Sequence, residues 1–240
     1  MKRFALLCAM LWFYVAFAAP VRAAPLTVVL PEVIPHAFLA PDGRQMGIYL
    51  DVLNAVAKES GIALRYQIVP FARVVRMLND GETDLALVNR DAVNPAQATA
   101  LGAIYQLDLV LWPARGARWQ SLSELAGKDV GRLRGGCQPL LQKTQPKFNE
   151  VNNFDQGVRM LDVGRLDALC GSRDVILYAI WRSGLPGLAT LTPLPLTTTP
   201  VFLMANPKVS PALQQRLATA VAKVMAGPTL QQAKARFGLH

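Results

Sequence analysis

The stretch MLNDGETD at residues 77–84 recurs as MLDVGRLD at residues 160–167, at a fixed offset of 83 residues. The match continues to Arg90-Asp91 and Arg173-Asp174, which gives six identities in 15 positions. In each copy, the pattern predicts a helix that ends at a glycine and a strand that begins at the aspartate. The repeat therefore indicates two related units, each of which places an Arg-Asp pair just beyond the end of a strand, where open α/β sheets bind ligands.

Strand and helix signals alternate along the chain on either side of the repeat. The expected strands are 26–30, 64–69, 84–88, 128–134, 150–154, 167–171 and 201–205, and the expected helices are 51–60, 70–78, 139–147, 155–163, 211–225 and 229–237. A β-α-β-α-β order implies parallel strands with right-handed crossovers. Because the order restarts after Trp112, we expect an α/β protein with two lobes of about 100 residues each.

The amino terminus has the three parts of a secretory signal peptide. Lys2 and Arg3 supply the positive charge, residues 4–19 form an apolar run, and Val21-Arg-Ala23 ends in small residues. A retained membrane anchor is the alternative, but 16 apolar residues are short for a span of about 20. We therefore predict that residues 1–23 are removed and that the mature chain is soluble in the periplasm.

Composition and charge narrow the possible partners. Apolar residues make up 52% of the chain, and three of its nine net positive charges (Lys2, Arg3 and Arg22) belong to the signal, which leaves +6. The remaining basic residues are scattered and lack the interleaved aromatics that single-stranded nucleic acid would need. His36 and His240 are the two histidines, so neither a metal site nor a cofactor is expected.

Several short motifs occur in a specific order along the chain. They are Gly47-Ile-Tyr-Leu-Asp51, Leu78-x-x-Gly-x-x-Asp84, Leu125-x-Gly-Lys-x-Val-Gly131, Gly164-Arg-Leu-Asp-Ala168, and Gly227-Pro-Thr-Leu230 followed by Arg236-Phe-Gly238. Together they resemble the amino-acid-type periplasmic binding proteins, solute-binding protein family 3, over nearly all of the mature chain. The resemblance implies a type II periplasmic binding fold, in which two lobes, each a mostly parallel sheet flanked by helices, are joined by two crossover hinge segments.

The resemblance also implies lobe boundaries and a function. The first lobe would comprise residues 24–110 and 204–240, and the second lobe residues 111–203. The protein would be a monomeric, non-catalytic receptor that captures a small polar or anionic solute, amino-acid-like or a small organic acid, for the membrane subunits of an ABC transporter. Two alternatives stay open. One is a periplasmic dehydratase or lyase of small acids, and the other is a ligand-sensing partner of a membrane sensor.

This sequence departs from the grip by which the family holds an amino acid. The arginine that pairs with the α-carboxylate would fall at Ala96 or Gln97, the aspartate that meets the ammonium at Ser172, and an aromatic ring at Ile48. A buried charge that has lost its partner is costly, so the joint absence of both anchors predicts a ligand other than a common L-amino acid.

Eleven residues are candidates for ligand binding. They are His36, Phe38, Tyr49, Arg73, Asn89, Asp91, Arg134, Gly136, Cys137, Ser172 and Arg173. Phe38 could equally pack in the core, whereas His36 is expected to be exposed or ligand-facing. Free N–H groups after the Gly135-Gly136 turn would favour an anion. Arg173 could replace the missing carboxylate partner or form a local ion pair with Asp174. For the enzymatic alternative, the acid and base candidates are Asp91, Asp174 and His36.

Two cysteines, Cys137 and Cys170, remain after removal of the signal. If the second lobe has the strand order 2-1-3, their strands are neighbours and both cysteines lie near the same strand ends. A disulfide is then possible in an oxidising compartment. A catalytic cysteine is not expected, because the second lobe contains no histidine to activate it.

Overall fold

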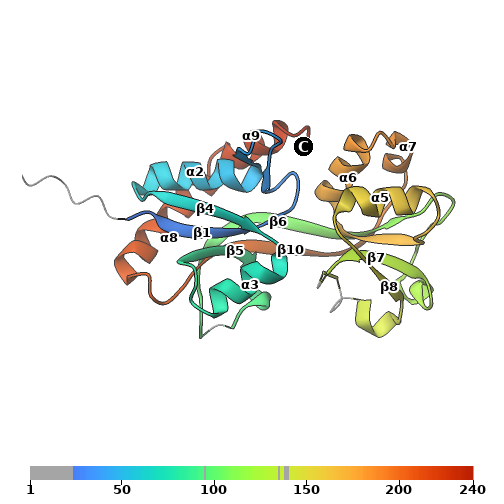
Figure 1. Cartoon of the computed structure of the whole chain (residues 1–240), viewed down its shortest axis with the longest axis horizontal. Helices are drawn as coiled ribbons and strands as arrows, with labels where there is room; N and C mark the ends of the chain where they lie inside the picture. The colour runs from blue at the N-terminus through green and yellow to red at the C-terminus, as the bar shows by residue number, and fades with distance from the viewer. Residues whose placement is uncertain (1–23, 95, 135, 138–140, 240) are drawn as a thin grey trace, which may run out of the picture.

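The computed structural model describes residues 24–94, 96–134, 136–137 and 141–239, so the predicted signal peptide lies outside the described residues. The elements gather into two lobes along the long axis of the molecule (Figure 1). The first lobe contains β1 (Leu26–Pro31), the hairpin β2 (Phe38–Leu39) and β3 (Gln45–Met46), β4 (Leu64–Val69), β5 (Leu85–Asn89), α2 (Ile48–Ser60), α3 (Phe71–Asn79), α8 (Pro211–Met225) and α9 (Thr229–Ala235). The second lobe contains β7 (Asp129–Leu133), β8 (Lys147–Val151), β9 (Ala168–Ser172), α5 (Phe154–Asp162), α6 (Arg173–Arg182) and α7 (Pro186–Ala189).

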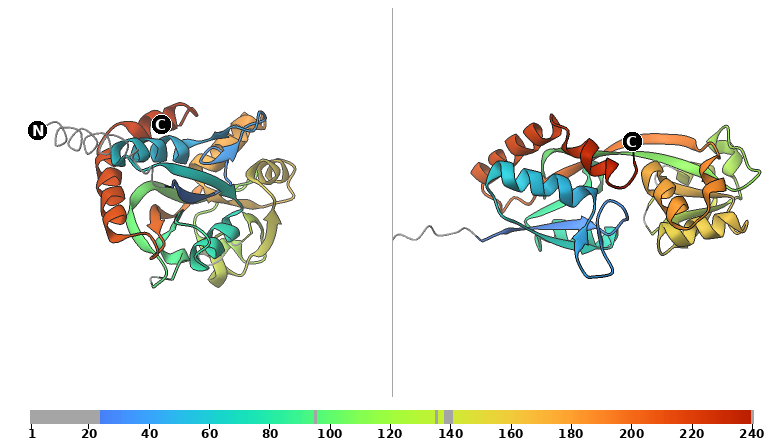
Figure 2. Two further views of the ribbon diagram at one scale, coloured as in Figure 1. Left: turned by 60° about the vertical axis from the view of Figure 1, so that its left-hand side comes forward. Right: turned by 90° about the horizontal axis from the view of Figure 1, so that it is seen from above.

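One eight-stranded sheet runs through both lobes, in the order β4-β1-β5-β10-β6-β9-β7-β8. In each lobe the three outer strands are parallel and follow the order 2-1-3, as β4-β1-β5 and β8-β7-β9. The central strands β6 (Thr99–Pro113) and β10 (Leu194–Ala205) are antiparallel to each other and extend into both lobes (Figure 2). The predicted α/β class and two-lobed fold are therefore confirmed.

The sheet is narrowest between the lobes. β5 pairs with β10 over Val201–Ala205, whereas β9 pairs with β6 over Leu109–Pro113. Between these regions, two short segments pair only with each other among the described strands: Gln106–Asp108 of β6 and Thr198–Pro200 of β10. We call these two segments the neck. The predicted lobe boundaries at 110/111 and 203/204 fall inside β6 and β10 and stay a prediction.

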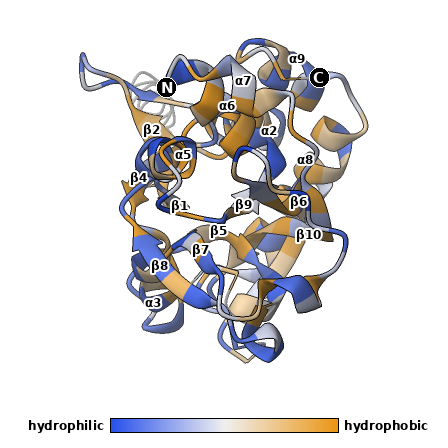
Figure 3. Cartoon of the chain, turned by 90° about the vertical axis from the view of Figure 1, so that its right-hand side faces the viewer, coloured by the Kyte–Doolittle hydropathy of each residue, from blue (hydrophilic) through white to orange (hydrophobic). Residues whose placement is uncertain are grey.

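Helices cover both faces of the first lobe's sheet. Val28 and Leu30 of β1 pack in the core with α2 and α8, whereas Val29 between them packs in a second core with α3. A view along the long axis shows α2 and α9 on one side of the strands and α3 on the other (Figure 3). This two-sided burial explains why β1 is a continuous apolar run rather than an alternating one.

The repeat folds into the same turn twice. Gly81 and Gly164 have φ angles of 73° and 71°, the left-handed conformation that glycine adopts at a helix end. Oδ2 of Asp84 then accepts a 2.8 Å hydrogen bond from the backbone N–H of Thr27, and Oδ2 of Asp167 accepts one of 2.8 Å from Asp129. Each aspartate thus holds the start of the first strand of its own lobe.

The sequence misplaced one part of the second lobe. Residues 139 and 140 of the expected helix 139–147 lie outside the described residues. Its second half is wrong, because Gln142–Thr144 forms a single 3-10 turn and Lys147 already begins β8. The 3-10 turn ends at Gln145, whose φ of 51° does not continue a helix. Strand β8 consequently lies three residues earlier than the expected strand 150–154. The sequence analysis also missed α6, the whole of β6 and the part of β10 before Val201.

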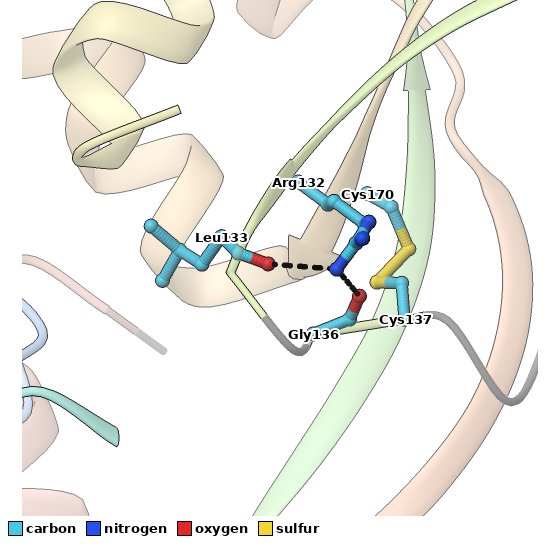
Figure 4. Close-up of a disulfide and its surroundings, with 5 residues drawn as sticks. All are labelled: Arg132, Leu133, Gly136, Cys137 and Cys170. Carbon is cyan, nitrogen blue, oxygen red and sulfur yellow. Dashed lines mark hydrogen bonds between the residues drawn. A yellow bond between two sulfur atoms is a disulfide. The ribbon is translucent and has the colours of Figure 1, made fainter. Parts of the chain in front are cut away.

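A disulfide joins Cys137, in the loop after β7, to Cys170 in β9, with a Cα–Cα distance of 6.3 Å (Figure 4). The side chain of Arg132 lies beside it. One guanidinium nitrogen donates long hydrogen bonds to the carbonyl oxygens of Leu133 and Gly136, at 3.5 and 3.4 Å. The loop that follows β7 is therefore fastened to the sheet by a covalent bond and by a buried cation.

We predict that Asp84→Ala and Asp167→Ala each lower the free energy of unfolding by about 1–3 kcal/mol, because a strand N–H loses its acceptor in a partly buried site. Urea unfolding followed by circular dichroism measures this. Asp42→Ala is the control, since Asp42 is exposed and its one partner among the described residues is Arg44. Equal unfolding curves for all three variants would contradict the assigned role.

The disulfide should stabilise the second lobe by restricting its unfolded state. We predict that the double variant Cys137→Ser/Cys170→Ser loses about 3–4 kcal/mol, the loop-entropy value for a bridge of this span, which is 33 residues. Denaturant unfolding of the oxidised, reduced and double-serine proteins tests this. Addition of reductant should destabilise the native protein and leave the variant unchanged.

Candidate ligand-binding cleft

A cleft with a volume of about 560 Å³ opens between the lobes. The first lobe lines it with the loop after β1 and the start of α3, and the second lobe with the ends of β7 and β8, the first turn of α5 and one face of α6. Its side chains include Glu32, Ile34, Pro70 and Phe71 from the first lobe, and Arg134, Glu150, Asn152, Phe154, Asp155, Tyr178 and Arg182 from the second. The volume is within the range of small-molecule sites, about 300–1,000 Å³.

Strand direction explains why these segments meet. Glu32 directly follows β1, Pro70 follows β4, Arg134 follows β7 and Asn152 follows β8. The strands of each parallel set end at the same edge of the sheet, which is where open α/β sheets bind ligands. The cleft thus lies between the carboxyl-terminal edges of the two parallel sets.

Charge is divided unequally between the two walls. On the second lobe, Nε of Arg134 donates a 2.9 Å hydrogen bond to Glu150, and the guanidinium of Arg132 lies 3.6 Å from the same carboxylate. Two cations therefore share one anion. Arg182 is paired with Asp155. Among the residues that line this wall, Arg134 and Arg182 are balanced by Glu150 and Asp155, while Arg132 lies behind the lining with its side chain 8% exposed. The Arg134 side chain is 84% exposed.

The first lobe contributes the opposite charge. Glu32 is exposed in the loop after β1, and no ion pair within 4.0 Å involves it among the described residues. The cleft thus has an exposed guanidinium on one wall and an exposed carboxylate on the other, which can face opposite charges of one ligand. Phe71, Phe154 and Tyr178 add aromatic surface between them.

The first turn of α5 is held in place by its own side chains. Asn153 caps the helix by accepting a 2.9 Å hydrogen bond from the N–H of Gln156. The Gln156 side chain in turn accepts a 2.8 Å bond from the N–H of Asn152. This reciprocal cap leaves a rigid helix start facing the cleft.

Of the eleven predicted binding residues, only Arg134 lines this cleft among the residues that the structure describes. Arg73 and Arg173 are exposed elsewhere, Ser172 is buried at the start of α6, and Asp91 lies in the 3-10 turn Arg90–Ala92. The ligand-binding roles of all eleven residues stay predictions.

The remaining predicted residues have structural contacts. Asn89 donates a 2.8 Å hydrogen bond to Thr199 in the neck. The ring of Phe38 packs edge-on against Phe237, with centroids 6.1 Å apart. Gly136 and Cys137 belong to the disulfide loop described above.

The expectation that His36 is exposed is wrong, and its ligand-facing role stays a prediction. Its side chain is 2% exposed, and its ring lies 4.8 Å from that of Tyr49 and 4.6 Å from that of Tyr105. The loop folds inward because the carbonyl of His36 accepts a hydrogen bond from the N–H of Tyr49. A Cβ on Gly47 would lie 2.3 Å from that carbonyl oxygen, so only glycine permits this approach.

The His36 cluster is electrically neutral inside the first lobe. Burial lowers the pKa of His36 to about 4, an effect that Asp174 opposes and Lys234 reinforces. Burial also raises the pKa of Tyr49 and of Tyr105, and the hydrogen bond to Asp174 raises that of Tyr105 further. An uncharged imidazole is therefore required for this packing.

Sequence reasoning missed most of the cleft residues. A usable signal existed for Glu32, since it immediately follows an apolar strand that ends at Pro31. Glu150 and Asn152 were hidden because β8 was placed three residues late. Tyr178 and Arg182 lie on α6, a helix that the sequence analysis did not predict.

His36 should make the protein acid-sensitive. Its pKa is about 4 in the folded protein against 6.5 when exposed, so the unfolded state takes up a proton first as the pH falls. We predict that stability is lost between pH 6.5 and 4, by about 3 kcal/mol from this group. Urea unfolding of the native protein and of His36→Phe at several pH values isolates the contribution, because carboxylates titrate equally in both. Parallel pH profiles would contradict it.

Comparisons with known proteins agree with this geometry. Residues 26–94 match the family of bacterial extracellular solute-binding proteins, family 3. No curated protein matches the sequence significantly. Within the described residues, no helix is both long and apolar enough to cross a membrane.

Solved structures match nearly the full length of the chain. The GLUR0 ligand-binding core in complex with L-glutamate has a TM-score of 0.76 at 20% identity, covering 90% of this chain and 98% of that one. A periplasmic binding protein of Salmonella typhimurium with high arginine specificity has a TM-score of 0.71 at 21% identity, covering 89% and 99%. A histidine kinase sensor domain similar to periplasmic binding proteins has a TM-score of 0.74 at 15% identity, covering 90% and 96%. These findings confirm that the chain resembles the family 3 solute-binding proteins and has the two-lobed type II periplasmic binding fold.

Proposed function

We propose that this chain is a periplasmic substrate-binding protein that captures a small polar or anionic solute between its lobes and presents it to the membrane subunits of an ABC importer. The observation that carries the proposal is the shared lining of the cleft. Glu32 and Phe71 come from one lobe and Arg134 and Tyr178 from the other. Since a solute in the cleft contacts both lobes, binding favours closure about the neck.

The charges of the walls suggest how a solute would lie. A carboxylate or other anionic group would face Arg134, whose guanidinium offers several donors in one plane. A cationic group, if the solute has one, would face Glu32 across the cleft. The predicted absence of the usual amino-acid anchors leaves an amino-acid-like compound of unusual shape or a small organic acid as the favoured classes.

The positions of two of the three acid and base candidates, His36 and Asp174, favour binding over catalysis. His36 is buried outside the cleft, and Asp174 is occupied by contacts with Tyr105 and Lys234. Neither group lies where it could exchange a proton with a solute in the cleft. The proposal therefore assigns no reaction to this chain.

A sensing role is the second candidate, and the similarity to a histidine kinase sensor domain favours it. Both roles require solute binding and differ only in the membrane partner. The solute-loaded protein would stimulate ATP hydrolysis by a reconstituted importer in the first case. In the second case it would change autophosphorylation of a membrane kinase.

A thermal-shift screen against amino acids, organic acids and amines tests solute binding directly. We expect at least one organic acid or unusual amino acid to raise the melting temperature without being consumed, as followed by mass spectrometry. Binding of a common L-amino acid would contradict the predicted loss of the family anchors, and consumption of the solute would favour the enzyme.

Variants then locate the site. We predict that Arg134→Gln weakens binding of an anionic solute by about tenfold or more, the effect of losing a charge-assisted hydrogen bond. Glu32→Gln should weaken binding only of solutes that also carry a cation. Calorimetric titration measures both, and Arg159→Gln is the matched control because Arg159 is exposed on the same lobe outside the cleft.

A further inference from the structure

Outside the cleft lining, helix α6 of the second lobe makes polar contacts with the first lobe. Asp174 lies in its first turn, and Oδ2 of this residue accepts a short hydrogen bond from the hydroxyl of Tyr105. Nζ of Lys234, on α9, lies 3.1 Å from the same oxygen. Tyr105 belongs to the part of β6 that pairs with β10 within the first lobe. One carboxylate oxygen thus receives two donors from across the lobe boundary.

An aromatic contact lies one helical turn further along α6. The ring of Tyr178 packs edge-on against Phe237, with centroids 6.0 Å apart. Residues four apart share a face of a helix, so Asp174 and Tyr178 meet the carboxyl-terminal region of the first lobe together. Phe237 is in turn packed against Phe38 of the hairpin. A polar contact and an apolar contact therefore connect α6 to the carboxyl-terminal region of the first lobe.

Burial makes these contacts stronger than an ordinary surface ion pair. The side chains of Lys234 and Asp174 are 25% and 21% exposed, and Tyr105 is buried. Reduced contact with water lowers the screening of the attraction between Asp174 and its two donors. Tyr105 cannot follow Asp174 outward, because its ring is packed against those of His36 and Tyr49.

We propose that Asp174 and Tyr178 on one side, and Tyr105, Lys234 and Phe237 on the other, form an inter-lobe latch. The latch holds the lobes in the arrangement of this structure, and rotation about the neck requires these contacts to break. Its role in regulating the cleft rests on the proposed function. A solute can shift the equilibrium between the two lobe arrangements only by the difference between its affinities for them. The latch adds a constant free energy that favours the arrangement of this structure.

Distance measurements between the lobes test the latch without any solute. Spin labels at Lys58→Cys and Arg159→Cys report on the first and second lobes, since both positions are exposed on helices. We expect one dominant inter-lobe distance in the otherwise native protein. Lys234→Gln and Asp174→Asn should each broaden it or populate a second distance, with the population ratio changed about fivefold or more.

Matched variants separate the latch from a general loss of structure. Lys234→Arg keeps the charge and should retain the native distance distribution. Lys223→Gln is the control, because Lys223 forms an exposed pair with Glu59 within the first lobe. Phe237→Leu tests the aromatic contact should a polar variant fail to fold, and it should shift the distribution in the same direction.

The outcomes distinguish this inference from the proposed function. Unchanged distances in folded Lys234→Gln, Asp174→Asn and Phe237→Leu would overturn the latch, whatever the cleft binds. Shifted distances in these variants, with none in Lys223→Gln, would support the latch even if no solute in the screen binds.

Discussion

The pairing of β6 with β10 is the constraint on which the rest of the structure depends. Both strands are shared by the two lobes, and at the neck they have only each other as neighbours among the described strands. A two-stranded ribbon twists and bends more readily than a wide sheet. Each lobe has its own hydrophobic cores on both sides of its strands. If the lobes move as the proposed function requires, the neck is where we expect the bending. There Thr199 accepts a side-chain hydrogen bond from Asn89, and Thr198 donates one to Asp108.

Helix α6 connects the cleft to the contact between the lobes at Asp174. One end carries Asp174, which faces the first lobe beside the neck, and the other carries Arg182, which lines the cleft. Tyr178, between them, belongs to both regions, because it lines the cleft and packs on Phe237 of the first lobe. A solute that displaces this ring would act on the cleft and on the lobe contact at once. The helix is short and packed on α5 and β6, so we expect it to move as a unit.

The sequence predicted the architecture far better than the site. The repeated glycines marked two equivalent turns, because a left-handed glycine ends a helix through local backbone geometry. The hydrogen bonds of Asp84 and Asp167 reach distant strands and could not be predicted from the repeat. His36 was misjudged because its burial depends on the close approach permitted by Gly47, which residue type does not reveal. Contacts of Asp174 with Tyr105 and Lys234 bring together three distant segments, and only the folded chain shows that they meet.

The position of β10 in the middle of the sheet has a consequence for how the molecule is assembled. This strand lies between β5 and β6 in space, yet it comes after every other strand in the chain. The parallel strands and helices of the second lobe all arise between β6 and β10, so most of its contacts are local in sequence. The first lobe is complete only when β10 and α8 have joined it, and both follow the whole second lobe in the chain. Non-local pairing slows folding in general, so we expect the first lobe to be completed after the second.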